Sequence, residues 1–284
     1  MSKRVARPTA TAIVPAFEIN QEQTMSASSS LPHHPVLTPQ EWIAARRQLL
    51  AEEKEFTRHQ ERIAAARRAL PWVKVEKQYV FDTPNGKVSL TDLFDGRSQL
   101  IVKHNMLNPK HDVCTGCSFE MDHIEGARVH LENHDVSIVA VSRAPLAQIK
   151  AAQRRMGWTI PWVSSYASDF NYDFHVSFKP EDIARGQVFY NYAVQPIPVE
   201  DLSGFSVFYK DEDGDIYLTY ASFGRGQENI ITTYVMLDIT PKGRNETARG
   251  NMTEWVRPHD RYDTDGYVDP IGQFVATKGC CQSA

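Results

Sequence analysis

The residues best suited to chemistry are the two cysteines of the sequence Cys114-Thr115-Gly116-Cys117. They follow an apolar segment and a loop, and they open a predicted helix that runs to about Asn133. A cysteine at a helix N-terminus lies at the positive end of the helix dipole, which favours the thiolate. A second cysteine three residues later lies within disulfide reach on the first turn. The pattern predicts a thiol–disulfide oxidoreductase in which Cys114 attacks a disulfide and Cys117 resolves the mixed disulfide.

Two alternatives use the same cysteines. Five histidines lie in one stretch of about 30 residues, at positions 104, 111, 123, 130 and 134. Thiolates and imidazoles together bind zinc or copper, and the alternative ligand set is Cys114, Cys117, His104 and His123. The spacing fits no standard zinc finger, and the chain has no second C-x-x-C. The other alternative is a pair of inert, structural thiols.

Two further residues are candidates to support the thiols. His123 follows Cys117 by six residues on the same predicted helix, and it either faces the thiol pair or is simply buried. Arg143 directly follows the apolar strand over 136–141 and its Ser142. Both remain candidate supporting residues of the predicted redox site.

A peroxide-reducing site is not favoured by the residues before Cys114. Peroxiredoxins carry Pro-x-x-x-Thr/Ser-x-x-Cys, whereas this chain has Leu107 and His111 at the Pro and Thr positions. Pro109 is displaced from the required position by two residues.

The elements that must position these residues alternate between strands and helices. Short strands are predicted at 78–81 and 87–90, buried strands at 99–103 and 136–141, a helix at 145–156, a strand from 161, a hairpin of 205–210 with 216–222, and a helix over 227–237. Strand–helix–strand units followed by a hairpin and a helix predict an α/β fold, a mixed sheet with helices on both faces.

A long helix is predicted ahead of this domain, over residues 38–71. Thr38-Pro39-Gln40-Glu41 forms a capping box with proline at the first helical position. Apolar residues then recur every seven positions: Trp42, Leu49, Phe56, Ile63 and Leu70. The helix either lies across its own domain or forms the arm of a homodimer, since an exposed apolar stripe seeks a partner.

The remaining segments are predicted to be irregular. Residues 1–37 are rich in Pro and Ser without hydrophobic periodicity, which predicts a disordered N-terminal segment. We expect no signal peptide, and hence a cytoplasmic, reducing location, with Met1 or Met25 as the start. The main domain is predicted over 72–240, followed by an irregular extension over 241–284.

Composition excludes several classes of function. The chain has 284 residues, and its 31 Lys and Arg against 35 Asp and Glu give a net charge of −4. That balance argues against a nucleic-acid partner, and no apolar run approaches the ~18 residues of a membrane span. Gly224-Arg225-Gly226 lacks the third glycine of a dinucleotide fingerprint, and there is no Walker A lysine. We therefore expect no cofactor.

The last motif is Cys280-Cys281, close to the C-terminus. Adjacent cysteines close only a strained ring, so their disulfide should be easily reduced. The tail resembles the vicinal-cysteine tails of high-molecular-weight thioredoxin reductases and mercuric reductases. It is either a relay that exchanges with Cys114 and Cys117 or an inert end.

Beyond single motifs, the chain resembles domain-of-unknown-function family 899, described as predicted dithiol-disulfide oxidoreductases with a thioredoxin-like fold. The stretches that carry the resemblance lie between about Pro35 and Tyr262, and include WIAARRQLLAEEKE, CTGCSFEMDHIEG, VSIVAVSRAPL, RMGWTIPWVSSYASDFNYDF and LSGFSVFYKDEDG. The resemblance implies a thioredoxin-like sheet, Cys114 and Cys117 as the redox pair, and a protein or small-molecule thiol or disulfide as partner.

One position departs from thioredoxins, which place a cis-proline before the strand that faces the cysteine pair. In the segment that resembles it, Ser203 to Phe208, Ser206 stands where the proline would be. The cis-proline presents backbone to extended substrates and blocks metal access. Ser206 is therefore a third candidate supporting residue, and its presence weakens a general role on protein disulfides and keeps metal binding open.

Overall fold

The computed structural model describes residues 34–244, 246 and 255–277. Most of the predicted disordered segment 1–37 lies outside these residues, as do Cys280 and Cys281. The chain divides into two compact units, residues 1–59 and residues 60–284. The boundary falls inside the first helix, α1 (Pro39–Arg68). The predicted chemistry belongs to the second unit, so the fold is described mainly for that unit.

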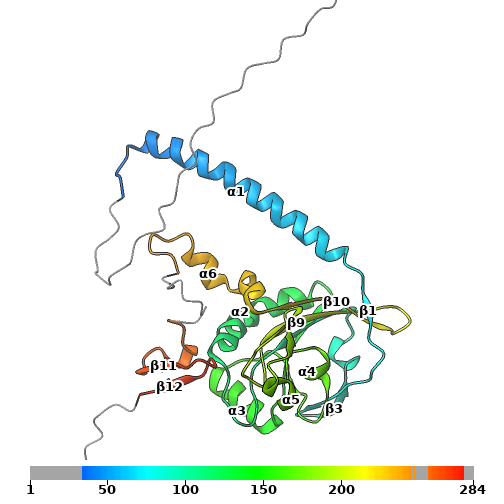
Figure 1. The fold of residues 1–284 in the computed structure, drawn as a ribbon. Coiled ribbons are helices and arrows are strands. Elements are labelled where there is room, and N and C mark those ends of the chain that lie inside the picture. The colour runs from blue at the N-terminus through cyan, green and yellow to red at the C-terminus, as the bar shows by residue number, and fades with distance from the viewer. Residues whose placement is uncertain (1–33, 245, 247–254, 278–284) are drawn as a thin grey trace, which may run out of the picture. The chain divides into compact units, whose positions relative to one another are not determined.

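An eight-stranded mixed sheet forms the centre of the second unit, in the order β1-β10-β9-β4-β5-β6-β2-β3 (Figure 1). Its strands are β1 (Val73–Lys74), β2 (Val80–Thr83), β3 (Gly86–Ser89), β4 (Gln99–His104), β5 (Val136–Ser142), β6 (Trp162–Ser164), β9 (Gly204–Lys210) and β10 (Ile216–Phe223). Two small antiparallel pairs are separate from it, β7 (Val188–Tyr190) with β8 (Ala193–Gln195) and β11 (Gly266–Val268) with β12 (Phe274–Ala276).

The second unit contains five complete α-helices and three short 3-10 helices among the described residues. They are α2 (Thr115–Glu132), α3 (Leu146–Met156), α4 (Phe170–Asp173), α5 (Pro180–Ala184) and α6 (Thr232–Leu237), with short 3-10 helices η1 (Asp92–Phe94), η2 (Gly224–Ile230) and η3 (His259–Arg261).

The middle of the sheet has the thioredoxin-like arrangement. Strands β4 and β5 are parallel and joined through α2, while β9 and β10 form an antiparallel hairpin against β4. The resulting order β10-β9-β4-β5 places β4 at the centre. Because α2 is the next helix after β4, a residue at the start of α2 stands near the carboxyl end of the central strand, where open α/β sheets carry their sites.

Successive side chains of the central strands point to opposite faces of the sheet, so the apolar core has two parts, one on each face. Ile138 and Ala140 of β5 pack with α2 and α3, whereas Val139 and Val141 pack with α4 and η1. Side chains of successive strand residues point to opposite faces, which gives a parallel strand its continuous apolar run. The predicted mixed sheet with helices on both faces is confirmed.

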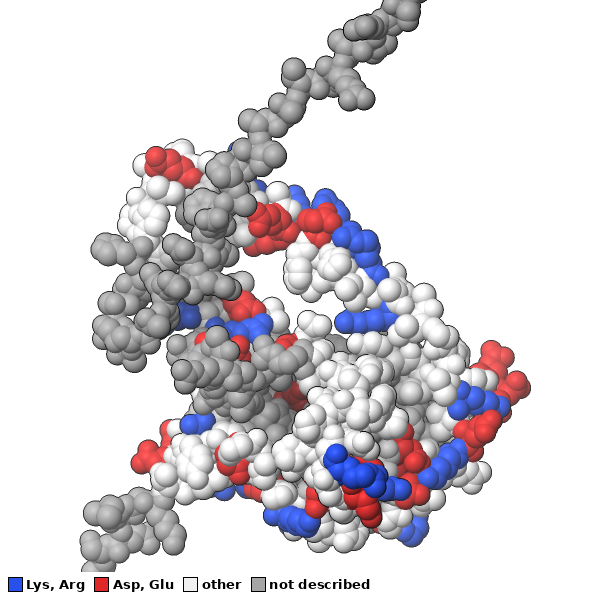
Figure 2. Space-filling model, in the orientation of Figure 1, with Lys and Arg blue, Asp and Glu red and all other residues white. Residues whose placement is uncertain are grey.

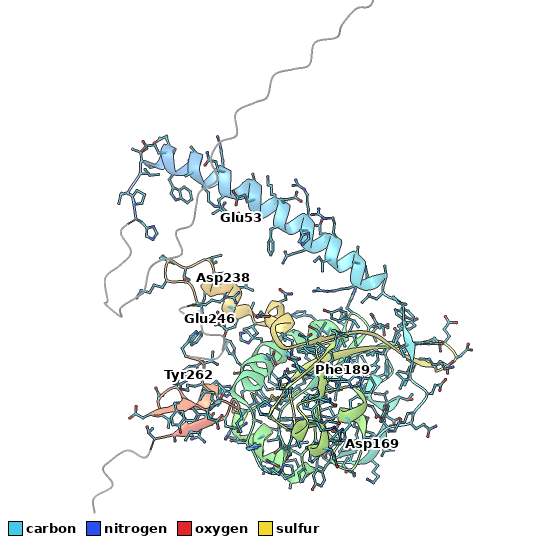
Figure 3. All side chains as sticks on the ribbon, viewed as in Figure 1. Glu53, Asp169, Phe189, Asp238, Glu246 and Tyr262 are labelled. Atoms are coloured by element: carbon cyan, nitrogen blue, oxygen red, sulfur yellow. The ribbon has the colours of Figure 1, made fainter. Side chains whose placement is uncertain are left out.

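The predicted long helix is also confirmed, as α1. Its capping box forms, since the Thr38 backbone N–H donates to Glu41 Oε2 at 2.9 Å and Thr38 Oγ1 donates to the same oxygen at 2.7 Å. Charged side chains of both signs lie along it (Figure 2), and Glu53 pairs with Arg46 at 2.6 Å (Figure 3). The apolar residues Trp42, Leu49 and Phe56 are exposed.

The C-terminal extension is more regular than its sequence indicates. It contains η3 and the hairpin β11–β12, which lies beside α2 and α3 (Figure 1). Val256 is fully buried in an apolar cluster with Phe119 of α2 and Tyr234 of α6. The Nε atom of Arg155 in α3 lies 3.6 Å from the Asp260 carboxylate. These contacts bring the hairpin back to the first turn of α2.

Among the helices that the structure describes, none is both long enough and apolar enough to cross a membrane.

Candidate functional site

The two cysteines stand where β4 leads into α2. Cys114 is the N-cap residue of α2, and Cys117 lies in its first turn. Met106, in the connecting loop, contacts both cysteines through its backbone. Its carbonyl accepts the Cys114 N–H at 3.1 Å, and its own N–H donates to Cys117 Sγ at 3.3 Å. The loop thus fixes the two thiols relative to the end of the central strand.

The pKa values of the two thiols are shifted in opposite directions. A hydrogen bond from Cys117 lowers the pKa of Cys114 to about 7, and the backbone N–H groups of Cys117 and Gly116 add to this against the effect of burial. The same hydrogen bond raises the pKa of Cys117 well above its usual value, and burial adds to the rise. Cys114 is 8% exposed and Cys117 is 1% exposed. Cys114 is therefore the thiol that ionises near neutral pH, and it is the less buried of the two.

A turn of the C-terminal hairpin covers Cys114, which the sequence did not indicate. The Thr115 N–H donates to the Gly272 carbonyl at 2.8 Å. Gly272 has a φ of +87°, and a Cβ atom added there would lie 2.9 Å from Cys114 Sγ. Only glycine combines this backbone conformation with such a close approach to the sulfur.

A buried ion pair lies behind the thiols. Lys103 of β4 is fully buried and pairs with Glu120 of α2. The Lys103 ammonium also donates to Ser203 Oγ at 2.5 Å and to Gln227 Oε1 at 3.2 Å. The charges act on the resolving thiol, because Lys103 lowers the pKa of Cys117 and Glu120 raises it. The sequence pattern does not indicate the pair of Lys103 and Glu120, because the loop between β4 and α2 separates the two residues in the chain.

Of the predicted supporting residues, His123 does not face the thiols. The Thr233 N–H donates to His123 Nε2 at 3.1 Å, so Nε2 is an acceptor, and Nδ1 then donates to the Phe119 carbonyl at 2.6 Å. His123 thereby fastens α6 to α2. The sequence could have indicated this, because six residues along an α-helix correspond to a rotation of about 240°.

Ser206 and His104 lie together on the face of the sheet opposite α2. Their Oγ and Nε2 atoms are 2.8 Å apart, and the His104 ring stacks near Phe174. Lys103 points toward Glu120 of α2, so the next residue in the strand points away from that helix. The residue of this segment nearest the buried ion pair is Ser203, not Ser206.

The alternative metal ligands are consequently not brought together. Cys114 and Cys117 are adjacent, but His104 and His123 point elsewhere, and the described part of the chain contains no group of three His, Cys, Asp or Glu residues that could hold a metal. The proposed relay residues Cys280 and Cys281 lie outside the described residues.

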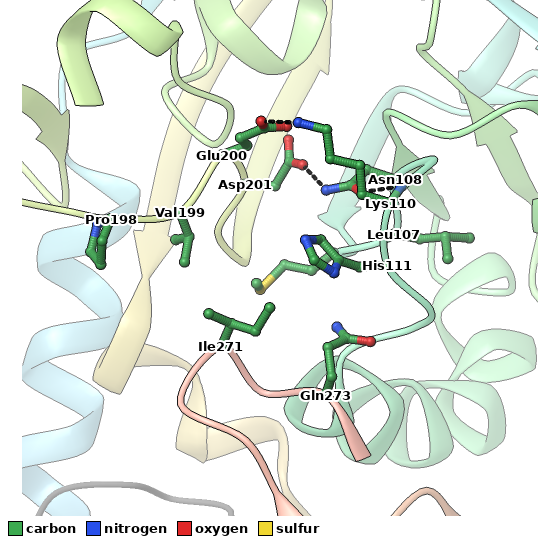
Figure 4. A pocket seen from close by; sticks show the side chains of 11 residues that line it. Leu107, Asn108, Lys110, His111, Pro198, Val199, Glu200, Asp201, Ile271 and Gln273 are labelled. Atoms are coloured by element: carbon green, nitrogen blue, oxygen red, sulfur yellow. Dashed lines mark hydrogen bonds and ion pairs between the residues drawn. The ribbon is translucent and has the colours of Figure 1, made fainter. Parts of the chain in front are cut away.

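A pocket of about 230 Å³ adjoins Met106, whose backbone contacts both cysteines, and we call it the thiol pocket. It is lined by residues 106–108, 110 and 111 of the loop after β4, by 198–201 before β9, and by 271 and 273 of the C-terminal turn. Figure 4 shows the His111 ring between Ile271 and Gln273 on one side and the two carboxylates at 200 and 201 on the other.

The remaining candidate supporting residue, Arg143, contacts one wall of this pocket. Its Nε lies 3.2 Å from Asp201 Oδ1, and the other oxygen of Asp201 accepts the Asn108 amide at 2.6 Å. Lys110 pairs with Glu200 at the rim (Figure 4). Arg143 therefore acts on the pocket wall and not directly on a thiol.

The family model described as "Bacterial protein of unknown function (DUF899)" matches residues 31–262. The chain belongs to this family. The resemblance carried by the sequence motifs is thus confirmed, and it covers both cysteines and most of the thiol pocket. No curated protein matches the chain.

Solved structures similar to the chain include the peroxidoxin BcpB of Mycobacterium tuberculosis, with 12% identity, a TM-score of 0.39, and 57% of this chain and 93% of that one covered. Peroxiredoxin Q of Xanthomonas campestris has 14% identity, a TM-score of 0.38, and coverages of 63% and 95%. BsSco, a member of the Sco family of cytochrome c oxidase assembly proteins, has 17% identity, a TM-score of 0.35, and coverages of 58% and 93%. Likeness at this level does not carry an activity over to this chain.

Proposed function

We propose that the protein is a thiol–disulfide oxidoreductase in which Cys114 is the nucleophile and Cys117 the resolving thiol. The observation that carries the proposal is the pair of thiols at the start of α2 with opposite pKa shifts, of which only Cys114 ionises near neutral pH. A thiolate at pH 7 beside a protonated partner is the starting state that disulfide exchange requires.

The reaction proceeds in two exchanges. The Cys114 thiolate attacks one sulfur of a disulfide R–S–S–R, the S–S bond breaks, and R–S⁻ leaves and takes up a proton. Cys117 then loses its proton and attacks Cys114 Sγ, which releases the second R–S⁻. The protein dithiol is oxidised to a disulfide by two electrons, and R–S–S–R is reduced to two thiols. A reducing compartment such as the cytoplasm suits this chemistry, because it restores the dithiol.

The proposal is tested with the full chain in which Cys280 and Cys281 are replaced by Ser. The reduced protein is mixed with bis(2-hydroxyethyl) disulfide and its peptides are identified by mass spectrometry. We expect a Cys114–Cys117 disulfide in this protein, and a stable mixed disulfide on Cys114 in the further variant Cys117→Ser. The matched variant Cys114→Ser should form neither. A mixed disulfide carried by Cys117, or no oxidation at all, contradicts the proposal.

The relay through Cys280 and Cys281 is a second, separate proposal. Mild oxidation of the unmodified chain should link the peptide of Cys114 and Cys117 to the peptide of Cys280 and Cys281. Turnover that is unchanged after truncation at Lys278 would remove the relay and leave the oxidoreductase proposal intact.

A further inference from the structure

We infer that the substrate of this site is a low-molecular-weight disulfide that reaches Cys114 through the thiol pocket, and that the C-terminal turn around Gly272 keeps folded proteins away from the sulfur. The inference rests on the proposed function and adds the substrate class and the route of access.

The first argument is the cover over the nucleophile. Cys114 is 8% exposed although it stands at the start of a helix. The Gly272 backbone approaches its sulfur so closely that a Cβ atom would lie 2.9 Å away. The Gly272 carbonyl in the same turn accepts the Thr115 N–H at 2.8 Å. A folded protein presents its disulfide on a broad surface, which would have to occupy the volume of this turn.

The second argument is that the thiol pocket is lined by the neighbours of the residues that cover and hold the sulfur. Met106, whose backbone contacts both cysteines, lines the pocket. Ile271 and Gln273, on either side of Gly272, line it as well. Its volume of about 230 Å³ admits one arm of a small disulfide.

The third argument is the chemistry of the walls. Met106 and Ile271 offer apolar contacts to the sulfur and methylene groups of a substrate arm, and Lys110 and Glu200 place both charges at the rim. The His111 imidazole lies between these two parts (Figure 4). This combination suits the disulfide of a small thiol whose arm ends in polar or charged groups, such as an amino acid disulfide.

The test uses the reduced full chain with Cys280→Ser and Cys281→Ser. Rates of Cys114–Cys117 oxidation are measured with cystine, bis(2-hydroxyethyl) disulfide, insulin and hydrogen peroxide. Each rate is divided by the rate at which the same oxidant consumes dithiothreitol, which removes its intrinsic reactivity. We expect the normalised rates of the small disulfides to exceed those of insulin and peroxide by about tenfold or more, which is about 1.4 kcal/mol in activation free energy.

A matched pair of variants tests the route. Ile271→Trp narrows the thiol pocket and should lower the normalised rate of the small disulfides by a similar factor. Ile239→Trp makes the same change at a position that is 86% exposed and outside the pocket, and it should leave that rate unchanged. Thermal unfolding monitored by circular dichroism checks that both variants are folded.

The outcomes separate the inference from the proposed function. A normalised rate for insulin or peroxide equal to that of the small disulfides overturns the substrate class while the thiol chemistry stands. An unchanged rate in folded Ile271→Trp overturns the route. If no oxidant forms the Cys114–Cys117 disulfide, the proposed function fails and the inference falls with it.

Discussion

At the scale of single residues, the hydrogen bond between the two thiols separates their roles. Cys117 donates to Cys114, which lowers the pKa of the acceptor and raises that of the donor. Helix position adds to this difference, because Cys114 is the N-cap and the backbone N–H groups of Cys117 and Gly116 lower its pKa. Cys114, the less buried of the two thiols, is therefore the stronger acid, as attack on an incoming disulfide requires.

Two substitutions at Cys117 distinguish its hydrogen bond from the effect of the helix. Cys117→Ser retains a donor and should leave the pKa of Cys114 near 7. Cys117→Ala removes the donor, and the pKa should rise toward the ordinary thiol value of about 8.5. The rate of iodoacetamide alkylation against pH measures both, in chains with Cys280 and Cys281 replaced by Ser. Identical midpoints for the two variants would show that the helix N-terminus alone sets the acidity of Cys114.

At the scale of elements, β4 and α2 are joined by the buried pair of Lys103 and Glu120. Lys103→Met leaves the Glu120 carboxylate buried without its cation, which should cost about 3–5 kcal/mol of unfolding free energy. The double variant Lys103→Met/Glu120→Leu should recover most of that loss, because neither charge then remains. Urea unfolding measures all of these free energies.

A surface pair gives the control for this prediction. Lys87 and Asp82 are 2.7 Å apart with side chains 68% and 37% exposed. Lys87→Met should cost less than about 1 kcal/mol, since exposed ion pairs contribute little. A loss in Lys103→Met as small as in Lys87→Met would contradict a buried, charged pair.

The opposite face of β4 makes stability dependent on pH. Burial lowers the pKa of His104 to about 3, and the nearby Lys103 adds to this. Unfolding restores the ordinary pKa of about 6.5. Between about pH 6.5 and about pH 3, His104 is therefore protonated in the unfolded chain and neutral in the folded chain. His104 therefore reduces stability as pH falls from about 6.5 to 3, by at most about 1.4 kcal/mol per pH unit.

His104→Asn should reduce the fall in the free energy of unfolding between about pH 6.5 and pH 4, regardless of how the substitution changes that free energy at pH 7. His130→Asn, at an exposed position of the same unit, should leave the slope unchanged. Urea unfolding at pH 7, 6, 5 and 4 provides the comparison, and equal slopes in the unmodified and His104→Asn proteins would show that the histidine is not buried in its neutral form.

At the scale of the whole molecule, the sequence predicts those features that depend on neighbours in the chain. Spacing was sufficient to place Cys114 and Cys117 at the start of a helix, and periodicity was sufficient for the central strands. The cover by Gly272 was not predictable, because it joins segments far apart in sequence and depends on the docking of the whole hairpin. His104 and His123 were grouped with the thiols because they are near in sequence, whereas strand alternation and helix rotation direct their side chains elsewhere.

The long helix α1 leads to a prediction about assembly. Trp42, Leu49 and Phe56 are 59%, 51% and 61% exposed, and they follow a seven-residue spacing along a helix that also carries twelve charged residues. Apolar side chains in a continuous stripe are a surface that favours association, and a seven-residue repeat is the spacing at which two helices pack along a common seam. We therefore expect the full chain to be a homodimer formed through α1.

Substitution within the stripe should break this dimer. Leu49→Glu places a charge on the seam, and the protein should then sediment as a monomer at concentrations where the unmodified chain is a dimer. Arg47→Gln changes the net charge by the same −1 at an exposed position of α1, and it should remain dimeric. Because the thiols belong to the other compact unit, the monomeric variant should retain disulfide exchange at Cys114. An unmodified chain that sediments as a monomer would leave the stripe without this role, and a Leu49→Glu variant that remains dimeric would place the interface elsewhere.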